Sequence, residues 1–280
     1  MSADFDVCVI GSGAGGGPVA AVAAEAGYRV VVLEKGPWYP SDQFLKDEIV
    51  QCRRPTFWPH KRDEPHVREW MEQSGKRHAY LTGDFWNGSL VGGASVLMSG
   101  FFLRLKPTDF RLRSTYGPVE DADVVDWPLS YDDLEPWYAR IEEEVGVSGL
   151  AWEDLPDDVR DKRSTEDIPF LPTREHPFAD RIDKTGAKLG LHPFPTPRAV
   201  LPEDWNGRRA CAYAGYCGSY GCRTEAKGSS LAAFIPRALK TKRCEIRPRA
   251  MVTKLVSDET GKVVKAEYRD AEGKLQTIEA

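Results

Sequence analysis

The feature that most constrains the fold is a glycine-rich loop near the N-terminus, placed directly after a short apolar run. Gly11, Gly13 and Gly16 follow the G-x-G-x-x-G spacing, and the run Val7 to Ile10 before them is rich in β-branched residues. In such loops the first glycine permits a tight turn, the second lets a pyrophosphate approach the backbone, and the third lets helix and strand pack closely. Residues 19–26 then predict a helix of small side chains, whose first turn faces the phosphates.

A carboxylate narrows the choice of dinucleotide. The apolar run Val30 to Leu33 predicts a second buried parallel strand, and Glu34 follows it immediately. A carboxylate about twenty residues beyond the glycines accepts hydrogen bonds from a ribose diol. Because it would repel a 2'-phosphate, Glu34 argues against NADP. These residues leave both NAD and FAD open.

Size and charge exclude several classes of function. A chain of 280 residues allows one large domain or two of ordinary size. A net charge of -5 gives no basic surface for nucleic acid. The N-terminus lacks the basic region of a signal peptide, and no apolar stretch reaches the length of a membrane span. We therefore expect no nucleic-acid binding, no direct membrane span, and a cytoplasmic chain, or a periplasmic one if a partner subunit carries the export signal.

The chain does not continue as a standard nucleotide-binding domain. After Gly36 an irregular stretch rich in Pro, Trp and His begins, with one helix expected from Asp42 to Cys52. An ordinary NAD dehydrogenase builds its domain from two consecutive mononucleotide halves, so the missing repeat weighs against that class. A second glycine-rich segment, residues 86–105, suits either a backbone that passes over a flat ligand or a tight turn in the core.

Later elements carry local signals. Ser130 and Asp133 resemble a capping box, and the helix that they begin is expected to end at Gly146. Its acidic run, residues 142–144, is expected on a solvated face. The other predicted elements are a helix over 177–189, a helix over 231–239 interrupted at Pro236, and a β-meander with strands at 251–257, 263–268 and 275–280.

Four further motifs follow the glycine loop in a specific order. They are Val-Gly-Gly-Ala-Ser at 91–95, Phe-Arg-Leu-Arg-Ser-Thr-Tyr-Gly at 110–117, Trp-Pro-Leu-Ser-Tyr-Asp-Asp-Leu-Glu-Pro-Trp-Tyr at 127–138, and Cys-Gly-Ser-Tyr-Gly-Cys-Arg-Thr-Glu-Ala-Lys-Gly-Ser at 217–229. Together the motifs resemble the glucose-methanol-choline (GMC) family of FAD oxidoreductases. The likeness extends over the whole chain and is greatest to the flavoprotein subunits of the bacterial gluconate and sugar dehydrogenase branch.

The resemblance implies an α/β fold. A Rossmann-like FAD-binding domain would combine a parallel sheet with the three-stranded β-meander, next to a partial α+β substrate or cap region. The expected division is an FAD-binding βαβ unit at 1–40, an FAD-contacting excursion at 41–110, a helical and irregular part of the substrate domain at 111–242, and the meander at 243–280.

The resemblance also selects FAD and implies which residues hold it. Glu34 would bind the adenosine ribose, Val252 would touch adenine through its backbone, and the second glycine segment would lie along the flavin. The full expected set is Gly11, Ser12, Gly13, Ala14, Gly15, Gly16, Glu34, Lys35, Val91, Gly92, Gly93, Ser95, Met98, Ser99 and Val252.

The implied reaction is the oxidation of a CH-OH group of a sugar, polyol or other alcohol. A base removes the hydroxyl proton while hydride passes to the flavin. Electrons would then go to an acceptor other than oxygen, through an electron-transfer subunit such as a cytochrome, and a small subunit would provide export.

The family's base is a histidine of the C-terminal half, and the 280 residues resemble only the N-terminal half. We therefore expect a truncated or split gene product and assign no catalytic residue. The five histidines, which lie in irregular or charged stretches and are interpreted as surface or structural, are His60, His66, His78, His176 and His192. Three alternatives stay open: a non-catalytic flavin- or nucleotide-binding module, one chain of a split enzyme, and an NAD-dependent dehydrogenase.

Three clustered cysteines are candidate metal ligands. Cys211, Cys217 and Cys222 stand in a loop rich in Gly and Tyr. Three thiolates in such a loop suit an iron–sulfur cluster of the three-iron type, or a zinc ion with one further ligand. The alternative is a structural thiol loop near the flavin.

Overall fold

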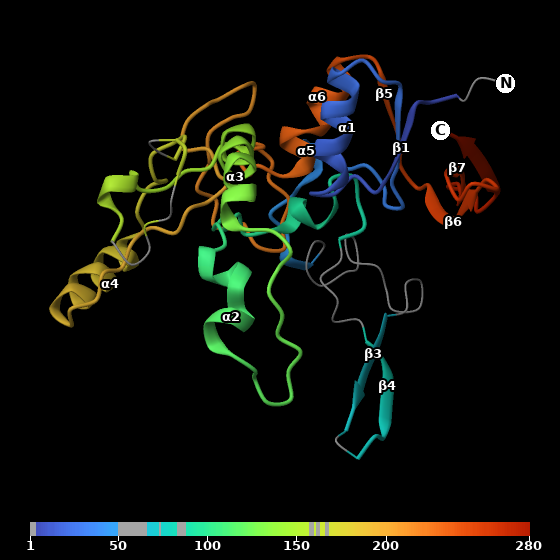
Figure 1. Ribbon diagram of the computed structural model, residues 1–280. Coiled ribbons are helices and arrows are strands. Elements are labelled where there is room, and N and C mark those ends of the chain that lie inside the picture. Colours follow the sequence, from blue (N-terminus) through green and yellow to red (C-terminus); the bar gives the residue numbers. More distant parts are fainter. Residues whose placement is uncertain are drawn as a thin grey trace. The chain divides into compact units, whose positions relative to one another are not determined.

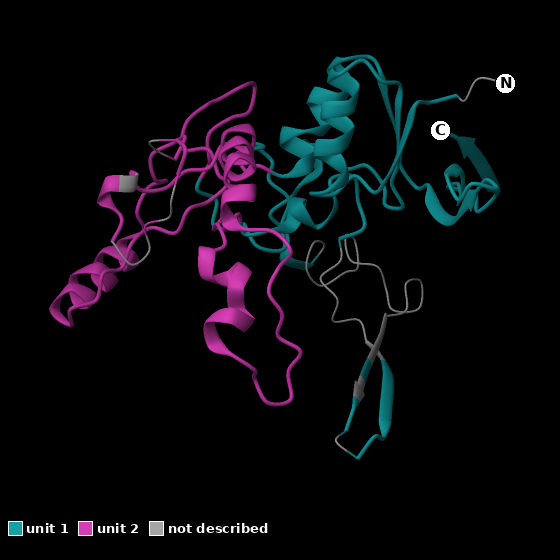
Figure 2. Cartoon of the chain, viewed as in Figure 1, with its two compact units in different colours: residues 1–99, 213–225, 229–280 teal, residues 100–212, 226–228 magenta. Residues whose placement is uncertain are grey.

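The computed structural model describes residues 4–49, 66–72, 74–82, 88–156, 160, 163–165 and 168–280. The chain divides into two compact units (Figure 2). Unit 1 comprises Met1–Ser99, Tyr213–Glu225 and Ser229–Ala280, and unit 2 comprises Gly100–Ala212 and Ala226–Gly228. Each unit is therefore assembled from segments that are separated in the sequence.

Unit 1 is built on a parallel sheet of three strands. β1 (Val7–Ile10) pairs with β2 (Val30–Leu33), and β2 pairs with β5 (Cys244–Arg247), in the order β1-β2-β5. All four residues of β2 are buried, as the sequence predicts for a parallel strand that is covered on both faces. Among the described strands, β1 has β2 as its one neighbour. The pairing of β5 with β2 was not predicted, because unit 2 lies between them in the sequence.

Helices cover one face of this sheet and the meander covers the other (Figure 1). The helices are α1 (Gly16–Glu25), α5 (Ser230–Ala233) and α6 (Ile235–Lys240), and the meander strands are β6 (Met251–Ser257), β7 (Val263–Arg269) and β8 (Leu275–Glu279). On the meander face, Val31 and Leu33 of β2 pack with Tyr268 and Ile278 in one buried cluster. The predicted meander and the predicted helix break near Pro236 are thereby confirmed.

The described residues of unit 2 include three α-helices. They are α2 (Leu112–Tyr116), α3 (Tyr131–Val145) and α4 (Pro177–Lys188). The Ser130–Asp133 capping box is present at the start of α3, and Gly146 ends the helix with a left-handed φ of 74°. Short 3-10 helices occur at Pro107–Arg111 and Trp152–Asp154 in unit 2, and at Ser41–Gln43 and Gly93–Leu97 in unit 1.

Two buried arginines join segments of unit 2 through ion pairs. Arg104 donates to Glu142 from Nε and Nη2, both at 2.8 Å, and to Glu135 Oε1 at 3.0 Å. Arg163 donates to the same Glu142 at 2.7 Å. The prediction of a solvated face for residues 142–144 is wrong for Glu142, which is 2% exposed, because the helical spacing places it on the side of Tyr131 and Val145. We call Arg104, Glu135, Glu142 and Arg163 the ionic network.

The structure departs from two other local predictions. The helix predicted from Asp42 to Cys52 is not continuous: a 3-10 turn spans Ser41–Gln43, Phe44 has an extended backbone, and helical structure resumes only at residues 48–49. The ring of Phe44 is 3% exposed and packs against Leu90 and Leu97, so tertiary packing determines this backbone; residues 50–52 lie outside the described residues. An antiparallel hairpin of β3 (His66–Met71) and β4 (Arg77–Thr82) was not predicted. Within the described ranges, no helix has the length and apolar composition needed to cross a membrane.

Candidate cofactor site

The first glycine loop has the geometry that its three glycines require. Gly11 has a φ of 84°, and its N–H donates to Leu33 O at 2.9 Å, which turns the chain at the end of β1. A Cβ on Gly16 would lie 1.9 Å from Gly11 O, so no side chain fits where α1 meets the turn. Next to Gly11 and Gly15, by contrast, a Cβ would meet nothing within 4 Å. The loop is therefore tightly packed toward the sheet and open on its outer side.

Glu34 is fixed at the end of β2 by two backbone N–H groups and one hydroxyl. Its Oε2 accepts from Ser12 N at 2.9 Å and from Ser12 Oγ at 2.7 Å, while Oε1 accepts from Gly36 N at 2.9 Å. The side chain is 4% exposed. Each carboxylate oxygen can accept two hydrogen bonds, so Oε1 keeps capacity for a ligand hydroxyl beyond its bond to Gly36. Gly36 was not among the predicted site residues, although its position two residues after Glu34 suits this contact.

The second glycine segment lies directly against the first. Gly92 N donates to Ser12 Oγ at 2.9 Å, and a Cβ on Gly93 would lie 2.8 Å from Gly13 Cα. Both Gly92 and Gly93 have positive φ values, of 95° and 58°. The structure thus brings together two glycine segments that the sequence presents as separate motifs, and only glycines permit the approach.

A serine outside the predicted set completes this junction. Ser95 Oγ donates to Gly92 O at 2.6 Å and accepts from Ser230 N at 3.0 Å, and Ser230 Oγ donates to Ser12 O at 2.7 Å. Ser230 is the first residue of α5 and is 2% exposed. The pair Ser229 and Ser230 before an apolar run signals a helix start, but nothing local signals the contact with Ser12.

The other predicted cofactor residues lie around the same junction. Ala250 N donates to Glu34 O at 2.8 Å, which places the chain leading into β6, and so Val252, beside the end of β2. Val252 is partly buried against the meander cluster. Val91 is fully buried in the cluster that contains Leu97, and Met98 and Ser99 follow the 3-10 helix with partial exposure. Lys35 is also partly exposed and Ala14 is exposed.

These residues fit a dinucleotide. The start of α1 is where backbone N–H groups lack helical partners, although Gly17 N donates to Gly13 O at 2.9 Å and Pro18 has no N–H. The outer side of the loop is open next to Gly11 and Gly15, where a phosphate would lie. Glu34 provides a fixed acceptor at the end of the neighbouring strand. The second glycine segment offers backbone without side chains beside this loop. Fixed donors, a fixed carboxylate and bare backbone are the groups that a pyrophosphate, a ribose and a flat ring system need.

The expected metal site has no support in the structure. Within the described part of the chain, which includes Cys211, Cys217 and Cys222, no group of three or more His, Cys, Asp or Glu side chains could hold a metal ion. Cys211 belongs to unit 2, whereas Cys217 and Cys222 belong to unit 1. Ser219 N donates to Leu97 O at 2.8 Å, so the loop of Cys217 and Cys222 packs against the second glycine segment.

The described histidines have structural or surface positions. His176 Nδ1 accepts from Phe178 N at 3.1 Å as the N-cap of α4, His78 contacts Glu72 at 2.6 Å, and His192 is exposed. His66 lies in β3, and His60 lies outside the described residues. The structure therefore adds no candidate base to the sequence analysis.

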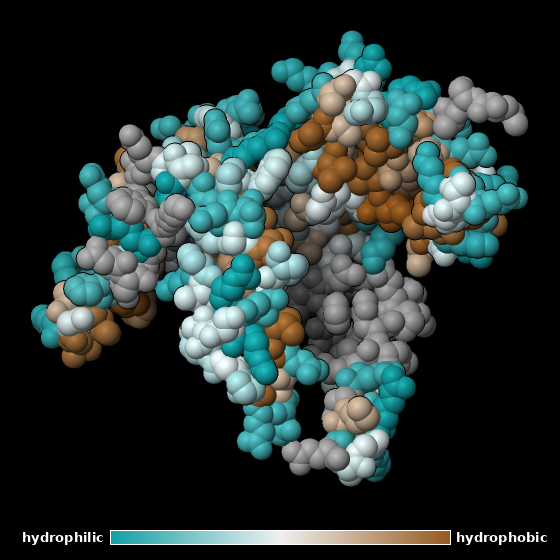
Figure 3. Space-filling view, in the orientation of Figure 1, coloured by the Kyte–Doolittle hydropathy of each residue, from teal (hydrophilic) through white to brown (hydrophobic). Residues whose placement is uncertain are grey.

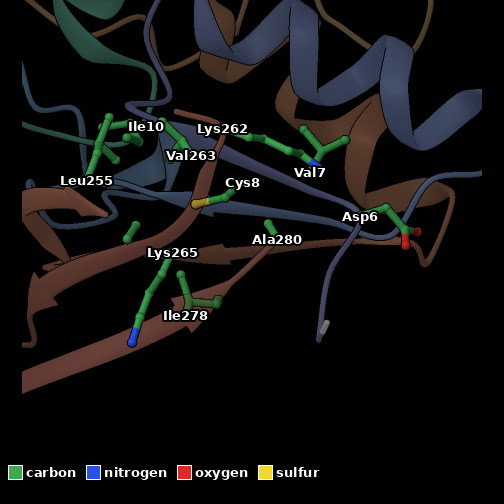
Figure 4. Close-up of a pocket in the computed structure, with 11 residues that line it drawn as sticks. Asp6, Val7, Cys8, Ile10, Leu255, Lys262, Val263, Lys265, Ile278 and Ala280 are labelled. Carbon is green, nitrogen blue, oxygen red and sulfur yellow. The ribbon is translucent and has the colours of Figure 1, made fainter. Parts of the chain in front are cut away.

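A pocket of about 400 Å³ lies between β1 and the meander (Figure 4). It is lined by apolar side chains such as Ile10, Val263 and Ile278, with Lys262 and Lys265 among the polar ones, and by none of the predicted cofactor residues. Burial raises the pKa of the Cys8 thiol in its wall. Hydrophobic side chains also gather on the surface over α1 and β1 (Figure 3).

Comparison with known proteins gives matches to flavin enzymes. No protein-family model matches the chain. The 6'''-hydroxyparomomycin C oxidase of Streptomyces lividus is 31% identical over 261 residues, which are 92% of this chain and 43% of the relative. The gluconate 2-dehydrogenase flavoprotein of Pantoea cypripedii is 26% identical over 297 residues, which are 96% and 48% of the two chains. The chain thus spans about half the length of the curated relatives that it matches.

Solved structures agree on the fold. The formate oxidase of Aspergillus oryzae, whose structure was described for its FAD modification, superposes on the whole chain with a TM-score of 0.57 at 14% identity, and the chain covers 45% of it. The parallel sheet, the meander and the paired glycine segments, together with these relatives, define the class as a flavin-dependent oxidoreductase fold. Within that class, the relatives that the chain matches are FAD oxidoreductases of the glucose-methanol-choline family.

Proposed function

We propose that the chain holds FAD across its two glycine segments and forms the cofactor-binding part of an enzyme that oxidises CH-OH groups. The observation that supports this most directly is the backbone contact between Gly13 and Gly93, next to the fixed carboxylate of Glu34. The first loop and Glu34 would hold the pyrophosphate and the adenosine ribose. The segment Val91–Ser99 would hold the flavin end, and Val252 the adenine.

The work of this chain in the reaction is binding and orientation. FAD, when bound, supplies the acceptor for hydride from the alcohol carbon. With FAD bound, N–H groups of the first loop would donate to the pyrophosphate, Glu34 would accept from the ribose, and the partly buried second segment would cover one side of the ring. No described histidine is placed to take the alcohol proton, so we assign the base to none of these residues. By the family resemblance, it lies in the part of the relatives that this chain does not cover.

The substrate and the partners are proposed at the level of chemistry. The proposed substrate is a sugar, a polyol or another alcohol, and the proposed electron acceptor is a protein or quinone rather than oxygen. The proposed partners are a cytochrome subunit and a small export subunit. The export subunit would carry the chain to the periplasm. The proposal includes no iron–sulfur cluster, because the described residues contain no suitable ligand group.

Ligand binding to the purified chain tests the proposal. The apoprotein is titrated with FAD, ADP, FMN and NAD while flavin fluorescence or heat is recorded. FAD should bind more tightly than FMN, because FMN lacks the adenosine that Glu34 recognises, and ADP should compete with FAD. Tight NAD binding without FAD binding would contradict the proposal and favour the NAD-dependent alternative.

Flavin reduction separates the enzyme from a non-catalytic module. The FAD-loaded chain is mixed anaerobically with sugars and polyols, and the visible absorbance of the flavin is followed. Bleaching by an alcohol supports the oxidoreductase activity for this chain. A loaded protein that no alcohol bleaches would support the flavin-binding module or the split-enzyme alternative.

A further inference from the structure

Three serines from distant parts of unit 1 form a closed circuit of hydrogen bonds around Gly92. Ser12 Oγ accepts from Gly92 N, Ser95 Oγ accepts from Ser230 N and donates to Gly92 O, and Ser230 Oγ donates to Ser12 O. The four distances lie between 2.6 and 3.0 Å. We call Ser12, Ser95 and Ser230 the serine junction.

The donor and acceptor roles in this circuit are mutually consistent. A serine hydroxyl has one proton to donate and two lone pairs. Ser12 donates its proton to Glu34 Oε2 and accepts from Gly92 N, whereas Ser95 donates to Gly92 O and accepts from Ser230 N. No hydroxyl has to donate twice. The arrangement is therefore chemically specific.

The junction fixes one residue of the second glycine segment from both sides. Gly92 has its N–H bound by Ser12 and its carbonyl bound by Ser95, with a φ of 95° between them. Ser12 is fully buried and Ser230 is 2% exposed, so water cannot replace their bonds easily. The orientation of the second glycine segment relative to the first loop thus depends on three hydroxyl groups.

We propose that the serine junction is a positioning device that holds the second glycine segment in register with the first loop, so that a ligand spanning both segments meets a preorganised site. The inference rests on the proposed FAD site. Ser12 acts on both segments, because its hydroxyl also fixes Glu34. Ser230, which is not a predicted ligand contact, acts only by joining Ser12 to Ser95.

The proposal predicts different effects on the binding of a short ligand and of a long one. ADP carries the adenosine and the pyrophosphate and engages the first loop alone, whereas FAD also reaches the second segment. Replacing Ser230 with alanine should therefore raise the dissociation constant of FAD about tenfold, the usual effect of one lost buried hydrogen bond, and change that of ADP less than about twofold. Replacing Ser12 with alanine should weaken both ligands.

Ser229→Ala is the matched control. Ser229 precedes Ser230 in the same helix start, is 5% exposed, and caps α5 by accepting from Ala232 N at 3.3 Å, but it takes no part in the junction. Its loss should lower the melting temperature of the apoprotein without changing the ratio of the FAD and ADP constants. Ser95→Ala and Ser95→Thr form a second pair, in which only the threonine keeps the hydroxyl and should restore FAD affinity.

The experiment measures FAD and ADP dissociation constants by fluorescence quenching and calorimetry, with melting temperatures of every apoprotein. If the unsubstituted chain binds neither ligand, the proposed FAD site and the junction both fail. If it binds FAD and Ser230→Ala binds FAD equally well, or if Ser230→Ala weakens ADP as much as FAD, only the positioning role is overturned. A Ser229→Ala effect as large as that of Ser230→Ala would also overturn it.

Discussion

Unit 1 and unit 2 each join distant segments through a buried polar junction, but they use different chemistry. The serine junction of unit 1 is neutral and consists of hydroxyl and backbone groups. The ionic network of unit 2 buries Arg104 and Arg163 against Glu135 and Glu142, with side chains between 3% and 8% exposed. The neutral junction adjoins the proposed cofactor site, whereas the ionic network connects helix α3 to neighbouring chain segments.

The difference lies in what each junction costs when it is broken. A buried charge left without its partner is destabilising by about 3–5 kcal/mol, whereas an unsatisfied neutral group costs about 1–3 kcal/mol. The ionic network should therefore control whether unit 2 folds. The serine junction should control the geometry of a site within a unit that stays folded. Substitutions in each unit can test this contrast.

The largest effect is expected from Arg104→Met. It removes three hydrogen bonds to Glu142 and Glu135 and leaves Arg163 as the remaining arginine partner of Glu142. The free energy of unfolding should fall by about 3–5 kcal/mol, measured by denaturant titration with tryptophan fluorescence. Arg140→Met, which removes the same kind of side chain from an exposed position of α3, is the control. Similar losses in the two variants would show that burial of the network is unimportant.

A smaller effect is expected where glycines of the first loop are replaced. Gly16→Ala drives a Cβ to within 1.9 Å of Gly11 O and should destabilise unit 1 by about 1–3 kcal/mol. Gly13→Ala meets only Gly93 Cα, at 3.7 Å, and should leave the melting temperature nearly unchanged. The same alanine occupies the approach of a pyrophosphate, so FAD affinity should fall more than about tenfold. A Gly13→Ala variant with a much lower melting temperature would contradict the expectation that this glycine matters for binding and not for packing.

The sequence predicts the features of both units that depend on neighbouring residues. Glu34 at the end of β2, the Ser130–Asp133 capping box and the turn at Gly146 were predicted and are present. The capping box and the turn depend on residues within a few positions, and Glu34 depends on the fixed spacing of one strand–helix–strand unit.

The junctions themselves could not be predicted, because they depend on long-range contacts. Ser12 and Ser230 form a hydrogen bond although most of unit 2 lies between them in the sequence. Strand β5 has the sequence Cys-Glu-Ile-Arg, which lacks the apolar pattern of a buried strand. The burial of Glu142 is the exception, because the sequence alone could have predicted it. The helical spacing of Glu142 from Tyr131 and Glu135 places it on the buried face of α3, although the adjacent acidic residues suggested a solvated one.

Acid should weaken the ionic network before it affects the serine junction. Burial opposes the ionisation of Glu135 and is the largest influence, but hydrogen bonds from Ser164 and Arg104 outweigh it, so the pKa of Glu135 is lowered. A carboxyl whose pKa is lower in the folded state stabilises the fold above its ordinary pKa, and this stabilisation is lost as the pH falls through the lowered pKa. Unit 2 should thus lose stability below about pH 4.5. Glu135→Gln should flatten this acid limb in melting curves, and an unchanged pH dependence would contradict the assignment.

The smallest effect is expected from the control substitution itself. Arg140 pairs with Glu144 one turn away on the exposed side of α3, at 2.8 Å, with 47% of the arginine side chain exposed. Such pairs contribute about 0.3–0.5 kcal/mol because water screens the charges and both side chains lose freedom. The effect of Arg140→Met should disappear in about 1 M salt, where the Debye length is about 3 Å, whereas most of the Arg104→Met loss should remain. Salt would thus distinguish the exposed pair from the buried network, both of which involve glutamates of α3. Equal salt dependence of the two variants would show that water reaches Arg104.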